Sequence, residues 1–272
     1  MPRPEWSVLL PFFNEAGAIV ATIESLAAQT VPVRVILIDN GSTDGSGAIA
    51  RAACERLRLD HLLLLERRPG KVAALEAGLA RVDTAWVATC DADTWYPPHY
   101  LAAAGRVLAR GSAVAGAFFV PDAADARIRR REARRIAATA AVLRGQCHTG
   151  GARQAFRTDA LRRAGGFDPG RWAYVLEDHE VIHRVRRHGA MRYASDLWCC
   201  PADRPRDRAS IRWTVGERLL YCIAAPVAGD WFFYRFLARR LSARRLTSDR
   251  IRERPFQDVG RTATAAPHAL CG

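Results

Sequence analysis

The sequence predicts an α/β fold, a mostly parallel sheet flanked by helices, and two observations lead to this prediction. Short apolar segments alternate with amphipathic segments along the first part of the 272-residue chain. The apolar segments, such as "VRVILID" at 33–39, carry hydrophobic side chains on both faces, as strands do when helices cover both sides of a parallel sheet. With 49% hydrophobic residues, the chain can form the core of one large domain or of two small ones.

The expected elements follow one another in a regular order. Strands are expected at 6–11, 33–39, 62–65 and 86–90, and helices at about 18–28, at 46–56 and after Lys71. The crossovers between these strands should be right-handed. Further along we expect a helix within "PPHYLAAAGRVL", a basic helix at about 126–143 and a helix that starts at the acids Glu177 and Asp178. After about residue 204 the sequence becomes irregular and aromatic.

The cysteines and the apolar segments indicate where the protein works. The seven cysteines are odd in number and form no C-x-x-C pair, which predicts reduced thiols and no zinc site. The apolar stretch at 219–229 is interrupted by Pro226 and is shorter than the roughly 20 residues that span a bilayer. The N-terminal apolar run is expected to be the first core strand rather than a signal peptide. These features predict a cytoplasmic protein.

The net charge of the chain is strongly positive, 41 − 28 = +13. Lys71 is the one lysine among these 41 basic residues and the others are arginines, as a codon-composition bias over the whole surface would produce. A basic protein favours anionic partners, such as nucleotides, phospholipid or diphosphate-linked substrates. Because the sequence has no zinc-finger, RNP or helix-turn-helix pattern, we expect no nucleic-acid partner.

Polar stretches follow four successive strands at their carboxyl ends. They are, in chain order, "PFFNEA", "DNGSTDGS", "RRPGK" and "DADT". In open α/β sheets, ligands bind outside the carboxyl ends of the strands. We therefore expect these four stretches to form one binding site.

Asp91 and Asp93 of "DADT" carry the clearest chemical signal. Side chains at i and i+2 of an extended chain point to the same face, where two carboxylates repel each other unless a cation lies nearby. Hard divalent cations bind such carboxylates together with phosphate oxygens. The pair therefore predicts a metal–diphosphate site, in which Asp93 holds the metal and Asp91 contacts a ribose or, through water, the metal. The alternative is an Asx-type turn before the helix that follows Pro98.

These motifs, in this order and together with "AFRTDALRRAGGFDPGRWAYVLEDHEVIHRVRRHG", resemble the motif series of the family 2 glycosyltransferases, which have the GT-A fold. The resemblance extends from about residue 6 to 196. It implies a Rossmann-type sheet and an inverting transfer of a hexosyl group from a nucleoside-diphosphate sugar, a UDP- or GDP-sugar, with Mn²⁺ or Mg²⁺ as cofactor. A fold by itself does not establish function, so each position needs its own argument.

The resemblance also implies roles for particular residues. The expected nucleotide-binding residues are Pro11, Phe13, Asn14, Glu15, Asp39, Gly41, Lys71 and Asp91. The expected metal ligands are Asp93 and Asp91, and the expected general base is Asp178. Gly150, Gly151, Arg157 and Glu177 are expected around the donor sugar and the acceptor.

Asp39 matches the acid that hydrogen-bonds the base in the family, and a carboxylate suits the imide N–H of uracil or the N–H donors of guanine. The sequence departs from the family at two neighbouring places, with Asn40 where a second Asp is frequent and Phe13 where Tyr is frequent. The alternative for Asp39 and Asp44 is a turn followed by a helix cap.

Lys71, Glu177 and Asp178 each have an alternative explanation. A compact ammonium after Pro69 and Gly70 suits a phosphate or base pocket, although a lone lysine can also be a surface residue. Acids at a helix start are favoured by the helix dipole whatever the function. An inverting transfer needs a carboxylate that takes the proton of the acceptor hydroxyl, and the resemblance assigns this role to Asp178. His179 and His183 lie four residues apart, but without a third partner we do not expect them to bind a metal.

We therefore predict a GT-A-like domain over 1–203, with a nucleotide-binding half to about residue 93 and an acceptor half over 94–203, and a C-terminal helical and aromatic extension over 204–272. The acceptor hydroxyl would belong to a cell-surface polysaccharide, a glycolipid or a metabolite. One alternative is a sugar-nucleotidyltransferase, which should carry a Gly- and Arg-rich phosphate loop after the first strand. The other is a non-catalytic, basic nucleotide- or membrane-binding module, which gives no reason for acids at the strand ends.

The extension combines aromatic residues and arginines at helical spacings, in "WTVGERLLYC" and "WFFYRFLARRLSARRL". Its helices could pack back on the domain with their arginines in solvent. Alternatively, they could lie on an anionic leaflet, which would suit a lipid-linked acceptor and a peripheral position at the inner face of the membrane.

Overall fold

The N-terminal half of the protein is built on four parallel strands. The computed structural model describes residues 5–121, 125–143, 146–148, 150, 153–202 and 213–250. The strands and helices of this half are β1 (Trp6–Phe12), α1 (Ile19–Ala27), β2 (Val33–Asp39), α2 (Ser46–Arg56), β3 (Asp60–Leu65), α3 (Lys71–Leu79) and β4 (Trp86–Thr89). The prediction of alternating strands and helices is confirmed. The third strand starts at Asp60, earlier than predicted, because Arg34 of β2 pairs with it.

The second half extends the same sheet. Its elements are β5 (Thr94–Trp95), α4 (Tyr100–Ala109), β6 (Val114–Phe119), α5 (Ala126–Val142), β7 (Gln154–Arg157), α6 (Thr158–Arg163), α7 (Glu177–Val185) and β8 (Met191–Pro201). The strand order is β3-β2-β1-β4-β7-β6-β8-β5. Only β7 and β5 run against their neighbours in this order, so the sheet is mostly parallel, as predicted.

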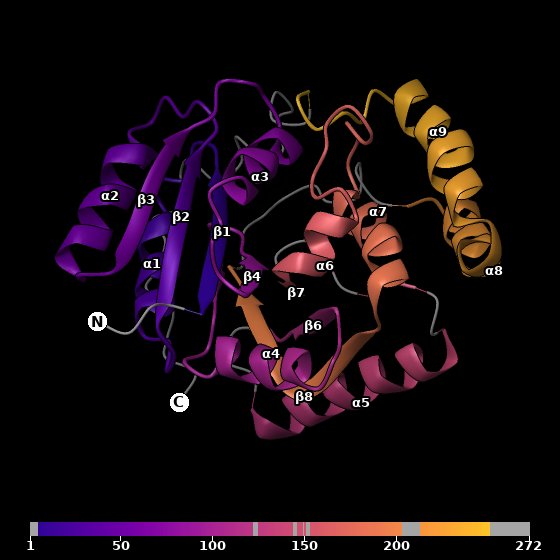
Figure 1. The fold of residues 1–272 in the computed structure, drawn as a ribbon, viewed down its shortest axis with the longest axis horizontal. Helices are drawn as coiled ribbons and strands as arrows, with labels where there is room; N and C mark the ends of the chain where they lie inside the picture. Colours follow the sequence, from indigo (N-terminus) through magenta and orange to yellow (C-terminus); the bar gives the residue numbers. More distant parts are fainter. Residues whose placement is uncertain are drawn as a thin grey trace.

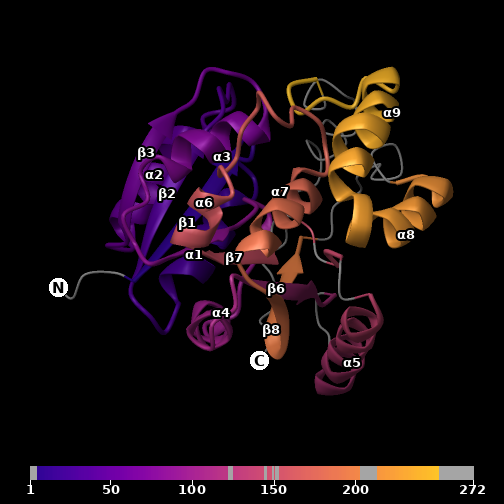
Figure 2. The same ribbon diagram turned by 45° about the vertical axis from the view of Figure 1, so that its right-hand side comes forward.

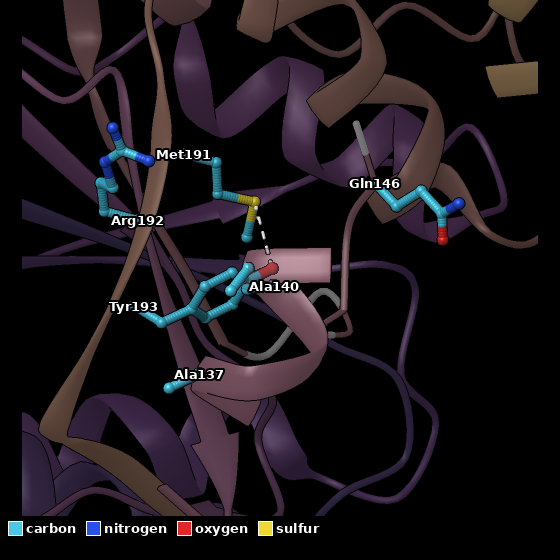
Figure 3. Close-up of a pocket in the computed structure, with 7 residues that line it drawn as sticks. Ala137, Ala140, Gln146, Met191, Arg192 and Tyr193 are labelled. Atoms are coloured by element: carbon cyan, nitrogen blue, oxygen red, sulfur yellow. Dashed lines mark hydrogen bonds between the residues drawn. The ribbon is translucent and has the colours of Figure 1, made fainter. Parts of the chain in front are cut away.

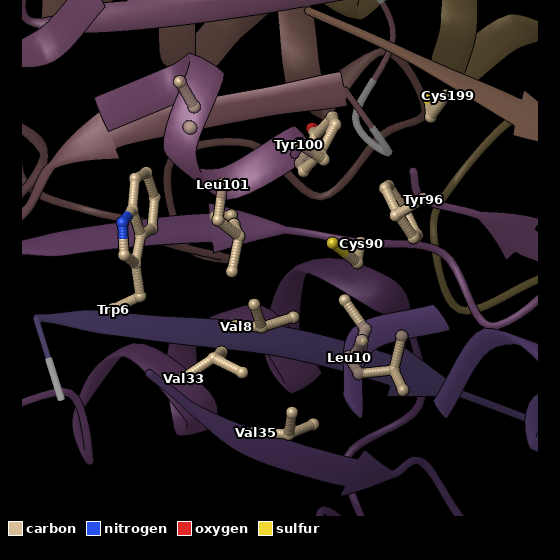
Figure 4. Close-up of a cluster of buried hydrophobic side chains, with 14 of the residues drawn as sticks. Trp6, Val8, Leu10, Val33, Val35, Cys90, Tyr96, Tyr100, Leu101 and Cys199 are labelled. Atoms are coloured by element: carbon tan, nitrogen blue, oxygen red, sulfur yellow. The ribbon is translucent and has the colours of Figure 1, made fainter. Parts of the chain in front are cut away.

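Helices cover both faces of the sheet, which explains why the central strands are apolar on both sides (Figure 1). Val8 and Leu10 of β1 pack into one core cluster, with residues of α1, α2 and α4. Figure 4 shows part of this cluster, with Tyr100 and Leu101 of α4 above β1 and β2. Leu9 and Ile36 point to the opposite face, into a second cluster with α3, α6 and α7. The alternation follows from the two-residue period of a strand.

The C-terminal extension folds back on the domain. It consists of α8 (Val215–Trp231), a π-helical segment (Phe232–Leu237) and α9 (Ala238–Ala243). Its aromatic residues form a third core cluster with Trp172 and Val175. Figures 1 and 2 both show α8 and α9 at the end of the molecule away from β3. In the described ranges, no helix has the length and apolar character needed to cross a membrane. The predicted division at residue 93 and the start of the extension at residue 204 stay predictions, and residue 204 lies outside the described residues.

Candidate functional site

The loops after β1 and β2 are hydrogen-bonded to each other. Asn14 has a positive φ of 54°, and its side-chain oxygen accepts a 2.8 Å hydrogen bond from the backbone N–H of Thr43. The N–H of Glu15 donates to the hydroxyl of Ser46, 2.8 Å away. Pro11 is buried within β1, and the half-buried Phe13 follows the strand. The structure therefore places these predicted nucleotide-binding residues together at the carboxyl end of β1.

Asp39 and Asp44 both accept hydrogen bonds from backbone N–H groups of the loops. The carboxylate of Asp39 accepts a 2.7 Å hydrogen bond from the N–H of Ser42, and Gly41, with a φ of 82°, makes the turn between them. Asp44 accepts hydrogen bonds from the N–H of Ala16 and of Ser46, both 3.0 Å. Burial acts against the charged form of Asp44, but these bonds outweigh it and hold its pKa below the ordinary value. The alternative that these acids serve the turn is what the structure shows, and the contact of Asp39 with a base stays a prediction.

Asn40 connects the loop after β2 to the loop that carries Lys71. The Asn40 side chain is buried, and its amide nitrogen donates to the carbonyl oxygens of Glu66 (3.0 Å) and Arg68 (2.8 Å). Its oxygen accepts from the N–H of Gly70, 2.8 Å away. A carboxylate could make only the last of these three bonds. The departure from the family pattern at this position therefore has a structural reason.

We expect Asn40→Asp to lower the free energy of unfolding by about 1–3 kcal/mol, because two carbonyl oxygens beside this buried side chain lose their donor and face a carboxylate instead. Urea unfolding of both proteins measures the difference. Thr43→Ala, at an exposed position of the same loop, is the control and should change stability by less than about 0.5 kcal/mol. Equal unfolding midpoints for Asn40→Asp and wild type would show that the Asn40 bonds are unimportant.

Three segments that are distant in the sequence meet at Lys71. Its ammonium nitrogen lies 2.6 Å from an oxygen of Asp91 and 3.7 Å from an oxygen of Glu177. The Lys71 and Asp91 side chains are each about one-third exposed (32% and 36%), whereas that of Glu177 is 16% exposed. Burial opposes the ammonium, but the two carboxylates outweigh it and hold the pKa of Lys71 above its ordinary value. Lys71 is therefore a charged residue of an acid-lined site.

Asp91 and Asp93 differ in how deeply they are buried. Asp91 follows β4 and its backbone N–H donates to the hydroxyl of Tyr96, 2.9 Å away. Asp93 is only 6% exposed, and its backbone oxygen accepts from the N–H of Ala202 beyond β8. Neither acid caps the next helix, because α4 begins at Tyr100, after the short strand β5. The two acids therefore do not cap this helix, but Ala92 and Asp93 do lie in a turn, so the Asx-turn alternative stays open beside the predicted metal site.

Glu177 and Asp178 open α7 but face different neighbours. The preceding Leu176 has a φ of 65°, an unusual conformation for leucine that often marks functional sites. The Glu177 carboxylate faces Lys71. An oxygen of Asp178 lies 3.3 Å from the point where a β-carbon on Gly150 would stand. Glu177 thus faces Lys71, whereas Asp178 faces Gly150.

Burial raises the pKa of both acids. It raises the pKa of Glu177 from 4.5 to about 7, although the Lys71 ammonium acts in the opposite direction and the Asp178 carboxylate adds to the rise. The pKa of Asp178 is raised as well, again chiefly by burial. Shifted carboxyl groups gathered in one place are typical of catalytic sites.

We expect the stability of the free protein to depend on pH through Glu177. Between about pH 4.5 and 7 the folded state binds this proton more tightly than the unfolded chain, so the contribution to the free energy of unfolding falls as pH rises through that window. Glu177→Gln should remove that part of the slope in urea unfolding, whereas Glu55→Gln, on the exposed side of α2, should retain it. A Glu177→Gln slope equal to that of wild type would contradict the shift.

Arg157 is not part of this group. Strand β7 runs antiparallel to β4, with Gln154 opposite Thr89 and Arg157 opposite Trp86, so Arg157 lies at the far edge of the sheet. Its guanidinium pairs with Asp159. Arg153, which precedes the strand, stands at the near edge instead, with a guanidinium nitrogen 2.9 Å from the Gly150 β-carbon position. Arg153 was missed because the sequence shows neither the direction nor the length of β7; Gly151 lies outside the described residues.

The two histidines of α7 pack against the extension. His179 is surrounded by the rings of Trp213 and Tyr221, and burial, with Arg218 and Arg153 nearby, lowers its pKa to about 3. His183 lies 2.8 Å from Asp230. Among the described residues, no group of three or more His, Cys, Asp or Glu side chains is arranged to hold a metal by itself.

Two cavities lie outside the acid cluster. One of about 530 Å³ lies beside the Lys71 loop and is lined by Pro69, Val72 and the chain around Ser248. The other, of about 370 Å³, lies between α5 and the start of β8, where the hydroxyl of Tyr193 contacts the sulfur of Met191 (Figure 3). Its lining contains no carboxylate.

Known sugar transferases are similar to this chain in sequence or in fold. The undecaprenyl-phosphate 4-deoxy-4-formamido-L-arabinose transferase of Serratia proteamaculans is 33% identical over 120 residues, which cover 42% of this chain and 37% of that protein. The mannosyltransferase PcManGT of Pyrobaculum calidifontis, in complex with GDP-Man and Mn²⁺, has a similar fold with a TM-score of 0.64. The two chains are 23% identical, over 89% of this chain and 75% of the other.

A second solved structure, S. aureus TarS 1–349 in complex with UDP-GlcNAc, has a TM-score of 0.58 and 16% identity, over 88% of this chain and 73% of that one. The predicted GT-A fold is therefore confirmed. The model of the family "Glycosyl transferase family 2" matches residues 7–165, more than half of the chain. The chain thus belongs to glycosyl transferase family 2.

Proposed function

We propose that the protein transfers a sugar from a UDP- or GDP-sugar to a hydroxyl acceptor, with inversion at the sugar carbon and with a divalent cation. One observation carries this proposal: Lys71, Asp91 and Glu177, from three separate segments, converge at the carboxyl edge of the sheet, and Asp178 lies beside them. The positive charge of Lys71 can attract a diphosphate, and the nearby carboxylates can bind the divalent cation that the diphosphate carries.

The carboxylate ligands that the site offers suit Mn²⁺ or Mg²⁺. Asp91 and Asp93 supply carboxylate oxygens, and since the described residues offer no three-ligand cluster, the diphosphate would supply further oxygens. When bound, the cation stabilises the negative charge of the leaving diphosphate. The solved mannosyltransferase with GDP-Man and Mn²⁺ supports this combination of ligands.

Asp178 acts on the acceptor. Its carboxylate takes the proton of the acceptor hydroxyl while that oxygen forms a bond to the anomeric carbon. The bond from this carbon to the diphosphate oxygen breaks on the opposite side, so the configuration inverts. A side chain on Gly150 would crowd the Asp178 oxygen and the Arg153 guanidinium, which lie 3.3 and 2.9 Å from its β-carbon position.

The acceptor we propose is lipid-linked. The relative from Serratia proteamaculans is named for undecaprenyl phosphate, a lipid, which supports a membrane-bound acceptor. The net charge of +13 suits an anionic membrane surface. A cytoplasmic position at the inner face of the membrane follows from this proposal. Membership in glycosyl transferase family 2 argues against both alternatives, a sugar-nucleotidyltransferase and a non-catalytic module.

A panel of nucleotide sugars tests the proposal. In the absence of an acceptor, water can replace the hydroxyl, so we expect slow release of UDP or GDP from one donor of the panel when Mn²⁺ is present. Chelation of the cation should stop this release. If no donor is hydrolysed and none shifts the melting temperature of the protein, the proposed function is wrong.

A further inference from the structure

Helix α8 is apolar on two opposite sides. Tyr221, Ala224 and Ala225 face inward and belong to the third core cluster, with Phe232 and Phe233. This side holds the extension on the domain. A helix that is apolar all round is normally buried all round. The other side of α8 therefore needs a separate explanation.

The outward side carries a row of large apolar residues, which we call the outer ridge; a kink at Ala228 separates its last member from the others. Its members lie four residues apart and are exposed as follows: Val215 78%, Leu219 61%, Ile223 74%, Val227 87% and Trp231 49%. Residues spaced by four form a ridge along one side of a helix. At a rise of 1.5 Å per residue, the part of the ridge before the kink, from Val215 to Val227, is about 18 Å long.

Positive charge accompanies the outer ridge. Arg218 is exposed in the first turns of α8, and the four-residue series continues after Trp231 as the exposed Arg235 and Arg239. The acids of the helix are engaged elsewhere: Asp230 pairs with Arg187 and His183, and Glu217 is buried against Arg240 and Arg244. The ridge therefore combines an apolar surface with exposed arginines that pair with no acid among the described residues.

We propose that the outer ridge is a membrane-docking surface, which enters the headgroup layer of an anionic bilayer. Interfacial helices carry such a combination, with an apolar side that ends in Trp and flanking arginines that contact anionic lipid. A second copy of this chain on the same ridge would bring the arginines of both copies together, whereas anionic lipid neutralises them. This inference rests on the lipid-linked acceptor of the proposed function and deepens it.

The docking surface is connected to the catalytic helix. The glycine at 229 lies so close to His183 of α7 that a β-carbon there would collide with the histidine ring. Tyr221 and Trp213 enclose His179, the residue after Asp178. Docking through α8 would therefore hold the start of α7, and with it Asp178, at a fixed position relative to the membrane.

Vesicle sedimentation with two matched variants tests this surface. We expect the wild-type protein to co-sediment at low salt with phosphatidylglycerol vesicles, and poorly with phosphatidylcholine vesicles. Ile223→Asp and Val227→Asp should lower the bound fraction about tenfold or more, because a carboxylate must enter the apolar layer. Leu65→Asp makes the same change at a residue that is 62% exposed at the end of β3, on the other side of the molecule, and should retain binding.

The possible results separate this proposal from its rivals and from the proposed function. Equal loss in Leu65→Asp and Ile223→Asp would mean that charge alone drives binding, and no wild-type binding would also overturn the proposal. A concentration-dependent dimer that Ile223→Asp abolishes would make the ridge a self-interface instead. Donor hydrolysis without vesicles should be unchanged in Ile223→Asp, so the two proposals can fail independently.

Discussion

Asp178→Asn should lower the rate of sugar transfer by roughly 10²–10⁴-fold and leave donor affinity near that of wild type. The asparagine keeps the shape of the side chain but cannot take the proton of the acceptor hydroxyl. Asp178 faces Gly150, whereas Lys71 contacts Asp91 and Glu177 on the nucleotide side, so the change should affect turnover and not binding. Initial rates with saturating acceptor, and calorimetric titration with the donor, measure the two effects.

Glu177→Gln is the matched control for this prediction. It neutralises the neighbouring acid of the same helix and should reduce the rate less, because Glu177 points toward Lys71 and the two side chains leave the helix about 100° apart. An Asp178→Asn enzyme with close to the wild-type rate would mean that the base lies elsewhere. It would equally fit an acceptor that is already ionised, such as a phosphate, which needs no base.

Asp93→Ala should weaken Mn²⁺-dependent binding of a nucleoside diphosphate by about 100-fold or more, because the cation loses the deeper of its two carboxylates. Binding measured without the cation should change little. Calorimetric titrations with and without Mn²⁺ provide the comparison.

Two further variants make this result interpretable. Asp93→Asn keeps the volume of a side chain that is only 6% exposed and guards against a folding defect in the alanine variant. Asp159→Ala removes an exposed acid that pairs with Arg157 at the far edge of the sheet, and should leave metal-dependent binding intact. Unchanged Mn²⁺-dependent affinity in both Asp93 variants would remove this residue from the metal site.

Much of the N-terminal half could be predicted because its sequence patterns are local. Each strand there is a short apolar segment, and its polar loop follows directly at the carboxyl end. Parallel strands bring these loops to one edge whatever the crossover lengths. The meeting of Lys71 with Asp91 is a consequence of this rule, although the two residues are 20 positions apart.

The second half depended on pairings that local patterns do not reveal. Strand β7 is inserted between β4 and β6 in the antiparallel direction. Because the strand is only four residues long, the residue before it and its last residue lie at opposite edges of the sheet. This is why Arg157, matched by its motif, lies away from the acids while Arg153 lies beside Gly150. Asn40 is a similar case, since its role depends on the carbonyl groups of another loop. For the extension, the sequence supports both packing on the domain and contact with a membrane. Helix α8 shows why, because its inner side packs on the domain and its outer side is apolar as well.

The central claim is that the acid-lined edge of the sheet supports a single displacement at the anomeric carbon of a nucleotide sugar. Proton NMR of the first minutes of donor turnover with Mn²⁺ tests it most directly. We expect the nucleoside diphosphate and a sugar product of inverted anomeric configuration to appear together, at rates that Asp178→Asn lowers. A product of retained configuration, or cleavage between the two phosphates to give a nucleoside monophosphate and a sugar phosphate, would contradict the mechanism.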